Sequence, residues 1–237
     1  MLCQFTVKNF KSIRDEVTFD MQAAAISEHE DRIIIDKDEE KYLPVSAIYG
    51  PKGGGKSNVL AALHTLVAKV LRPLFATEDS EEKVLLQKKT IVEPFAFSES
   101  KDEPTEFELF FRTTVSEYRY ILHVKRDIVL YESLDRVKLE TGRKSALFTR
   151  DENGIILKGA FAKLKVSDEL SKTLTLLSYL GIAYKGNAVV KDVLSWFEYG
   201  IEFLNYGNPI QELRMAVSTS EEVKQLMLQM IQEMDLD

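Results

Sequence analysis

Residues 106–126, EFELFFRTTVSEYRYILHVKR, alternate apolar and polar side chains in two consecutive runs. The apolar side chains share one face of each run: Phe107, Leu109 and Phe111 in the first, and Tyr118, Tyr120, Leu122 and Val124 in the second. A period of two is typical of strands that bury one face. The turn sequence DENG at 151–154 separates further short strands. We therefore predict a series of antiparallel hairpins over residues 91–160.

Shorter strands are predicted on the N-terminal side of this series. The segment 2–10, LCQFTVKNF, alternates apolar and polar residues, and EVTFDM at 16–21 offers a second strand. Residues 22–42 are polar and acidic, as in an exposed connection. PVSAIY at 44–49 is a short apolar run with a bias toward β-branched residues, which is typical of a buried strand.

A long helix is predicted directly after this buried strand. Residues 57–71 carry leucines and valines at helical spacing on much of the circumference, and Pro73 is expected to end the helix.

More helices are predicted after the hairpins. SDELSKTLTLLSYLG at 167–181 begins with a capping serine and ends with a glycine. Apolar stripes run through 189–204 and 221–234, and Ser218 with Glu221 is expected to form a capping box before the last helix. These helices predict an arm, so we divide the chain into a β-rich lobe at 1–165 and a helical subdomain at 166–237.

Composition limits the function. The chain has 237 residues, of which 45% are hydrophobic, enough for a sizeable core. Its net charge of −7 argues against coating nucleic acid by bulk attraction, although a local basic groove remains open. The single cysteine, Cys3, excludes an internal disulfide framework and fits a reducing compartment. With no leader and no membrane-spanning run apparent, we expect a cytoplasmic protein with no membrane partner.

The chemistry-bearing motif lies between the buried strand and the long helix. Its residues fit the P-loop pattern G-x-x-x-x-G-K-[ST]: Gly50, Pro51, Lys52, Gly53, Gly54, Gly55, Lys56 and Ser57. Glycines let the backbone amides curl around a phosphate, and the helix start adds partial positive charge. Lys56 would reach the β- and γ-phosphates of ATP, and the Ser57 hydroxyl would ligate Mg²⁺. The alternative is a glycine-rich turn with an incidental Lys-Ser.

Three stretches carry a resemblance to a known family: NFKS at 9–12, IYGPKGGGKSNVLAAL at 48–63 and PFAF at 94–97. With them the sequence resembles the ABC-like ATPases related to RecF and the structural-maintenance-of-chromosomes (SMC) proteins. It is similar in particular to AAA-family ATPases of bacterial phage-defence operons, akin to the overcoming-lysogenization-defect (OLD) proteins. Asn58 extends the match beyond the P-loop serine. The resemblance implies an α/β fold: a P-loop lobe with a mixed sheet wrapped by antiparallel hairpins, followed by a helical arm.

The resemblance also implies a mechanism and partners. In such ATPases each nucleotide is capped by the signature loop of a second copy, and hydrolysis releases the two. The expected partners are a second copy or a C-terminal ATPase lobe, a nuclease or other effector protein, and DNA, in anti-phage defence or DNA maintenance. Basic residues near the NFKS motif approach the base or ribose, which makes Lys11 and Arg14 candidate nucleotide contacts. The alternative for both is ordinary surface charge.

Two departures from the family pattern bear on activity. Lys52 replaces the family's asparagine, which adds a cation beside the phosphates. Neither the signature motif nor an apolar strand ending in Asp-Glu is found in the sequence; the nearest candidate, Asp36 in RIIIDKDEE at 32–40, reads as an exposed strand end. The chain is thus expected to correspond to the N-terminal half of a longer ATPase, binding nucleotide weakly and hydrolysing it slowly by itself.

Other functional readings remain open or are disfavoured. The alternative to an ATPase is a non-hydrolysing, nucleotide-dependent module that regulates a partner. A P-loop small-molecule kinase is disfavoured because hairpins, not alternating βα units, follow the P-loop helix. His29, His64 and His123 are not expected to build a site. Basic and tyrosine residues of the hairpins offer a candidate nucleic-acid face, interrupted by acids: Lys125, Arg126, Arg136, Lys138, Arg143 and Lys144, with Tyr118, Tyr120 and Tyr131.

Overall fold

The computed structural model describes residues 1–24, 30–36, 38–75, 92–97, 102–167 and 170–203, with isolated positions between 221 and 232. Internal contacts divide the chain into two units, Met1–Ile201 and Glu202–Asp237. In the second unit the isolated described positions between 221 and 232 are helical, and Lys224 Nζ donates to the Glu221 carboxylate at 3.3 Å. Most of the helix predicted at 221–234, and Ser218 of its expected capping box, lie outside the described residues.

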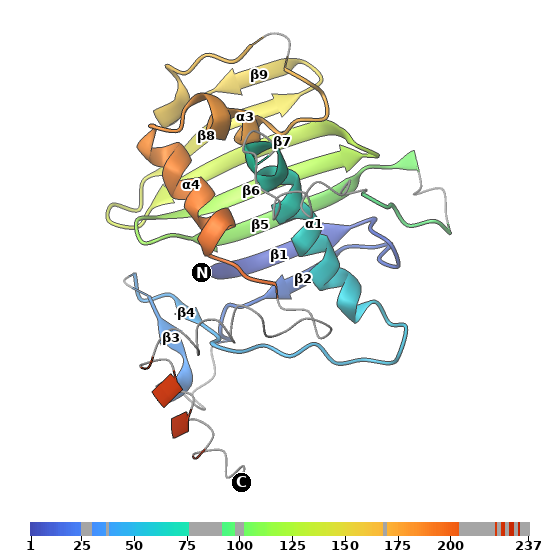
Figure 1. Ribbon diagram of the computed structural model, residues 1–237, viewed down its shortest axis with the longest axis vertical. Helices are drawn as coiled ribbons and strands as arrows, with labels where there is room; N and C mark the ends of the chain where they lie inside the picture. The colour runs from blue at the N-terminus through green and yellow to red at the C-terminus, as the bar shows by residue number, and fades with distance from the viewer. Residues whose placement is uncertain are drawn as a thin grey trace. The chain divides into compact units, whose positions relative to one another are not determined.

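A seven-stranded sheet organises the first unit (Figure 1). Its strands, in spatial order, are β2 (Val17–Asp20), β1 (Leu2–Lys8), β5 (Thr105–Arg112), β6 (Ser116–Lys125), β7 (Ile128–Lys138), β8 (Lys144–Asp151) and β9 (Gly154–Leu157). Every pairing in this sheet is antiparallel. A separate ribbon pairs β3 (Ile34–Ile35) with β4 (Lys41–Tyr42). The predicted hairpin series is confirmed from residue 105 onward.

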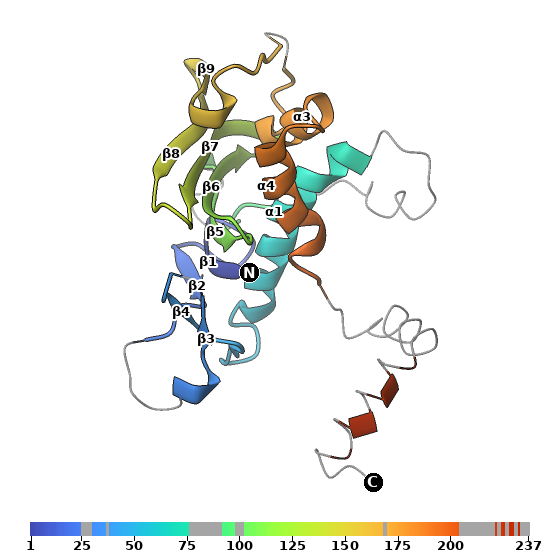
Figure 2. The same cartoon turned by 90° about the vertical axis from the view of Figure 1, so that its left-hand side faces the viewer.

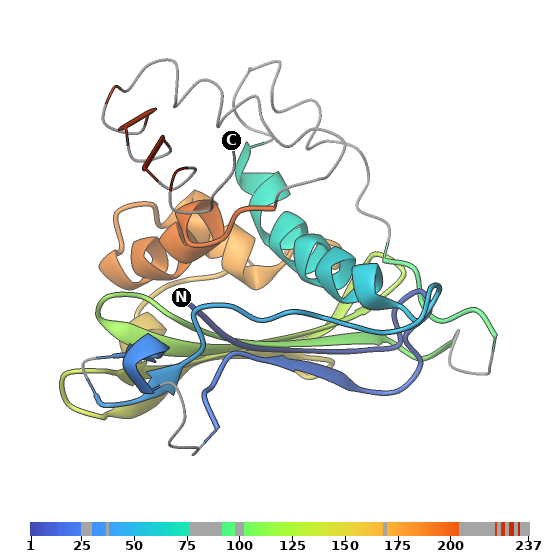
Figure 3. The ribbon, with the colours of Figure 1, turned by 90° about the horizontal axis from the view of Figure 1, so that it is seen from below.

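Three helices cover one face of the sheet, as Figures 2 and 3 show from two directions: α1 (Lys56–Phe75), α3 (Leu176–Ala183) and α4 (Ala188–Tyr199). Short 3-10 turns lie at η1 (Glu30–Arg32) and η3 (Gly159–Phe161). The predicted inward side chains of β5 and β6 are all buried against these helices, with the Phe111 and Trp196 ring centroids 4.5 Å apart. By length and composition alone α1 could cross a membrane, but its residues from Val59 to Val70 include eight that are buried within the protein, as in a core helix.

The expected mixed P-loop sheet is wrong. The sheet is antiparallel throughout, and residues 44–49 form no strand. Val45 and Tyr49 are 77% and 89% exposed. A strand exists only where a neighbour takes up its backbone hydrogen bonds, and no described strand pairs with this segment. The buried strand predicted at residues 44–49 from their apolar, β-branched composition is therefore wrong.

Two predicted helix ends also differ from the structure. Pro73 lies inside α1, which continues to Phe75. The helix predicted from Ser167 begins at Leu176, with Thr175 as its N-cap, and Gly181 lies within it. A Cβ on Gly181 would lie 2.5 Å from Leu194 Cδ1 and 2.7 Å from Leu74 Cδ2. This glycine thus permits close helix packing and does not end the helix.

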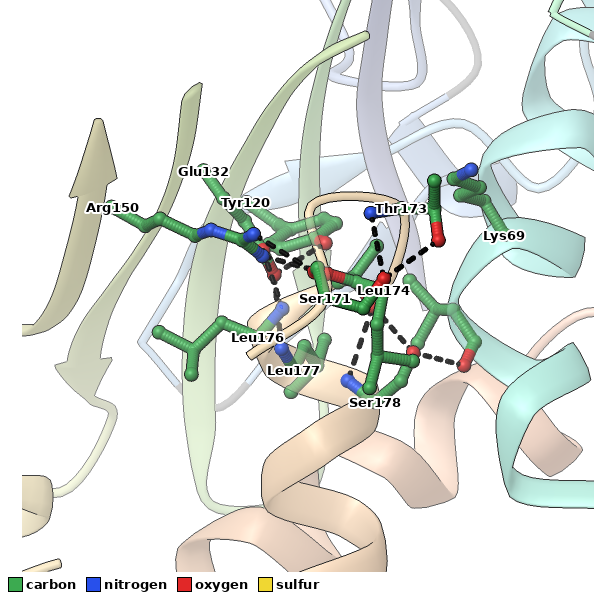
Figure 4. Close-up of polar contacts among 12 residues, drawn as sticks. Lys69, Tyr120, Glu132, Arg150, Ser171, Thr173, Leu174, Leu176, Leu177 and Ser178 are labelled. Carbon is green, nitrogen blue, oxygen red and sulfur yellow. Dashed lines mark hydrogen bonds and ion pairs between the residues drawn. The ribbon is translucent and has the colours of Figure 1, made fainter. Parts of the chain in front are cut away.

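The start of α3 is set by a buried carboxylate on the sheet (Figure 4). Glu132 accepts hydrogen bonds from the backbone amides of Leu176 and Leu177 and from the Tyr120 hydroxyl, at 2.6, 2.9 and 2.9 Å. Arg150 lies 3.9 Å from the same carboxylate and donates to two carbonyls of the preceding loop. Burial raises the pKa of Glu132, and these donors oppose the shift. The network fixes α3 over β6 and β7.

Candidate functional site

The glycine-rich loop enters α1 directly, with backbone angles that suit glycine. Gly53 and Gly55 both have φ of +83°, in the left-handed region. The Gly54 amide donates to the Pro51 carbonyl at 3.1 Å, which closes a tight turn. Gly53 and Gly55 thus stand where a side chain would strain the backbone. A loop of this shape at a helix start can present amide donors to an anion.

Lys56, the first residue of α1, is folded back onto the loop. Its Nζ donates to the carbonyl oxygens of Gly50 and Pro51, both at 2.8 Å. The ammonium group is therefore held at the loop and does not extend into solvent. Carbonyl oxygens are neutral acceptors, so an anionic phosphate oxygen would form stronger, charge-assisted hydrogen bonds with the same ammonium.

The other predicted loop residues lie around this lysine. Ser57 is exposed in the first turn of α1, and Lys52 is exposed on the loop. Asn58 is half-buried, and its backbone amide donates to the Gly55 carbonyl at 2.8 Å. Its side-chain Nδ2 donates to the Ser12 hydroxyl at 2.6 Å. The residues of the predicted P-loop therefore run directly into α1, and Asn58 connects them to the NFKS segment.

The NFKS segment forms a tight turn at residues 9–13, called the 9–13 turn below. Phe10 and Ile13 exchange backbone hydrogen bonds at 2.8 and 2.7 Å, and Asn9 and Lys11 have positive φ angles of 55° and 50°. The Lys11 amide donates to the Glu93 carbonyl at 2.8 Å.

Asn9 anchors this turn to two other segments. Its buried side chain donates to the carbonyls of Glu103 and Pro104, at 3.0 and 3.2 Å, and accepts from the Phe95 amide at 3.0 Å. Thr105 Oγ1 donates to the Asn9 carbonyl at 2.6 Å. All three stretches of the family resemblance are thereby connected: NFKS to PFAF through Asn9, and NFKS to the P-loop through Ser12.

The two basic candidates beside the turn differ. Lys11 is exposed and precedes Ser12, which touches the P-loop. Arg14 is exposed and pairs with its neighbour Asp15 at 2.8 Å. The Lys11 ammonium lies over the Phe10 ring, 5.5 Å from its centroid, whereas the Arg14 guanidinium is held by an adjacent acid.

No group of described residues forms a cluster of three or more His, Cys, Asp or Glu side chains that could hold a metal ion. His29 lies outside the described residues, and His64 is exposed on α1. His123 lies beside Tyr131, with ring centroids 5.1 Å apart, and burial lowers its pKa. Asp36 ion-pairs with Arg112 at 3.0 Å, which gives this strand-end acid a structural role.

The basic and aromatic residues of the hairpins do not gather on one surface. Tyr118 and Tyr120 are buried beneath the helices. Lys125 is the last residue of β6 and Lys138 is the last residue of β7, so they lie at opposite ends of this antiparallel pair. A strand advances about 3.3 Å per residue, so the two cations are separated by nearly the length of β7. The arrangement gives no support to a single basic and aromatic face.

Sequence reasoning missed the pairing of Ser12 with Asn58 and the exposure of residues 44–49. Ser12 and Asn58 both belong to motifs that the sequence analysis singled out. Their contact could not be predicted, because no local pattern pairs positions 46 residues apart. No protein-family model matches the sequence, and a search of curated proteins finds no match.

Proposed function

We propose that this chain binds ATP with Mg²⁺ at residues 50–58. The observation that carries the proposal is the loop itself: left-handed glycines at 53 and 55 lead straight into a 20-residue helix whose first side chain, Lys56, is held at the loop. Backbone amides and the helix dipole favour phosphate at such a position.

Each loop residue then has a role. Lys56 would exchange its two carbonyl acceptors for β- and γ-phosphate oxygens, and the exposed Ser57 hydroxyl would be a ligand for Mg²⁺. Lys52 adds a screened positive charge at the rim of the loop. Lys11 supplies a further cation on the side of the 9–13 turn.

We propose further that the chain acts within an ABC/SMC-like, dimerising ATPase in the cytoplasm, linked to DNA and to an effector such as a nuclease, in anti-phage defence or DNA maintenance. The quoted motifs support this setting. The exposed apolar residues Val45, Ile48 and Tyr49, directly before the loop, support a partner that covers them. A second copy or a C-terminal ATPase lobe would fit.

The second candidate is a nucleotide-dependent interaction module that does not hydrolyse ATP. It is favoured by Asp36, the acid that follows the isoleucine run, because that carboxylate is paired with Arg112. In this candidate, nucleotide binding at the loop would alter the exposed segment 44–49 and so control a partner. A steady-state ATPase assay separates the candidates: turnover that Lys56→Ala abolishes supports the first, and binding without turnover supports the second.

Binding is tested by calorimetry with Mg·ATP. The wild-type chain should bind, and Lys56→Ala should weaken binding at least tenfold without changing the circular dichroism spectrum. Lys191→Ala removes an exposed lysine on α4 and serves as the matched control. Inorganic tripolyphosphate should compete with ATP, since the loop recognises phosphate. Absence of binding by the wild-type chain, or equal binding by Lys56→Ala, would refute the proposal.

A further inference from the structure

A hydrogen bond between Ser12 and Asn58 joins the 9–13 turn to the P-loop. Asn58 Nδ2 donates to Ser12 Oγ at 2.6 Å. The same Ser12 oxygen would lie only 3.0 Å from a Cβ built on Gly55. One hydroxyl therefore touches the loop on both sides of Lys56 and Ser57.

The turn that carries Ser12 is a rigid support. It follows β1 directly, and the buried Asn9 side chain ties it to residues 95, 103 and 104. The Lys11 amide adds a bond to Glu93. These hydrogen bonds, with that from Thr105 of β5 to the Asn9 carbonyl, hold the turn that carries Ser12 in place.

The loop lacks a comparable support on its other side. Residues 44–49 pair with no described strand and are largely exposed. Apolar burial of α1 begins only at Val59. Among the described residues, the Ser12–Asn58 hydrogen bond is a polar link from the start of α1 to the turn that follows β1.

We infer that Ser12 and Asn58 are positioning residues for the triphosphate, which hold residues 50–58 in the conformation that receives phosphate. This inference rests on the proposed function. Ordering a loop upon binding costs conformational entropy, and a loop ordered beforehand avoids that cost. Loss of the Ser12–Asn58 bond would then raise the Kd for Mg·ATP even though neither side chain needs to touch the nucleotide.

A double-mutant cycle tests the inference. Ser12→Ala, Asn58→Ala and the double variant are compared with the wild-type chain for the Kd of Mg·ATP and for Tm. Removal of one hydrogen bond should raise Kd about fivefold. The double variant should bind no more weakly than either single variant, because both remove the same bond. Ser12→Thr keeps the hydroxyl and should restore most of the affinity.

Ser195→Ala is the matched control, since it removes a serine hydroxyl bonded to the Asp192 carbonyl on α4. It should leave Kd unchanged. If the wild-type chain binds Mg·ATP through Lys56, but Ser12→Ala and Asn58→Ala bind it with the wild-type Kd, the inference is overturned. The proposed function then stands. Fully additive losses would overturn the inference as well. If Asn58→Ala fails to fold, Ser12→Ala against Ser12→Thr carries the test, and equal Kd values for these two refute the inference.

Discussion

The carboxylate of Glu132, in the middle of β7, lies 2.6 Å from the backbone nitrogen of Leu176, the first residue of α3. An acid on one element thus caps the start of a helix 44 residues later in the chain. The contact is fully buried, so its loss leaves several polar groups without partners.

Glu132→Ala should therefore destabilise the protein strongly. It would remove the acceptor of two buried amides and of the Tyr120 hydroxyl, together with the carboxylate 3.9 Å from Arg150, a loss of about 3–5 kcal/mol. Glu132→Gln retains one acceptor and should cost less. Urea unfolding measures both, with the exposed turn residue Glu152→Ala as control. Equal stability of Glu132→Ala and the control would contradict the cap.

Gly181→Ala should lower stability by about 1–3 kcal/mol, because the added methyl would meet Leu194 and Leu74 at 2.5 and 2.7 Å. Gly186 offers a matched control, since a Cβ there has nothing within 4 Å. Thermal unfolding of the two alanine variants should therefore differ clearly. A Gly181→Ala protein as stable as Gly186→Ala would show that α1, α3 and α4 do not pack this closely.

Lys52→Asn should weaken ATP binding at low ionic strength by about two- to fivefold and have little effect at high salt. Lys52 is exposed on the loop, so its attraction to phosphate is screened by ions. Calorimetric titrations at two salt concentrations measure the change. Tighter binding by the asparagine variant would mean that Lys52 disturbs the loop.

Val45→Lys combined with Tyr49→Lys should leave the unfolding free energy of the isolated chain within about 0.5 kcal/mol of the wild type, because both side chains are exposed. A large loss would mean that residues 44–49 are buried in the isolated chain after all. If a second copy covers the segment, the same variant should abolish concentration-dependent association in sedimentation velocity.

Stability should decrease as the pH falls below 6.5, in part through His123. Burial lowers the pKa of this histidine from its ordinary value of 6.5, so the unfolded chain binds the proton more readily than the folded chain. The contribution is complete above pH 6.5 and is lost as the pH falls through the folded pKa. His123→Gln should flatten this part of the curve in urea titrations between pH 7 and 5. An unchanged slope would exclude His123 as its source.

Local patterns accounted for much of the fold. Alternation in residues 106–126 predicted the inward faces of β5 and β6, because a strand places successive side chains on opposite sides. Helical spacing likewise predicted α1. The start of α3 was missed because Ser167 is a reasonable cap by sequence, whereas the actual cap set combines Thr175 with the distant Glu132.

The hairpin series and the positive-φ glycines of the loop at residues 50–57 follow from local sequence, since period and positive-φ preference are properties of short segments. Three features emerge only once the chain is folded: residues 44–49 pair with no described strand, the seven-stranded sheet is antiparallel throughout, and Ser12 meets Asn58. Strand pairing and side-chain contacts depend on which distant segment lies alongside, and that outcome is set by the packing of the whole chain.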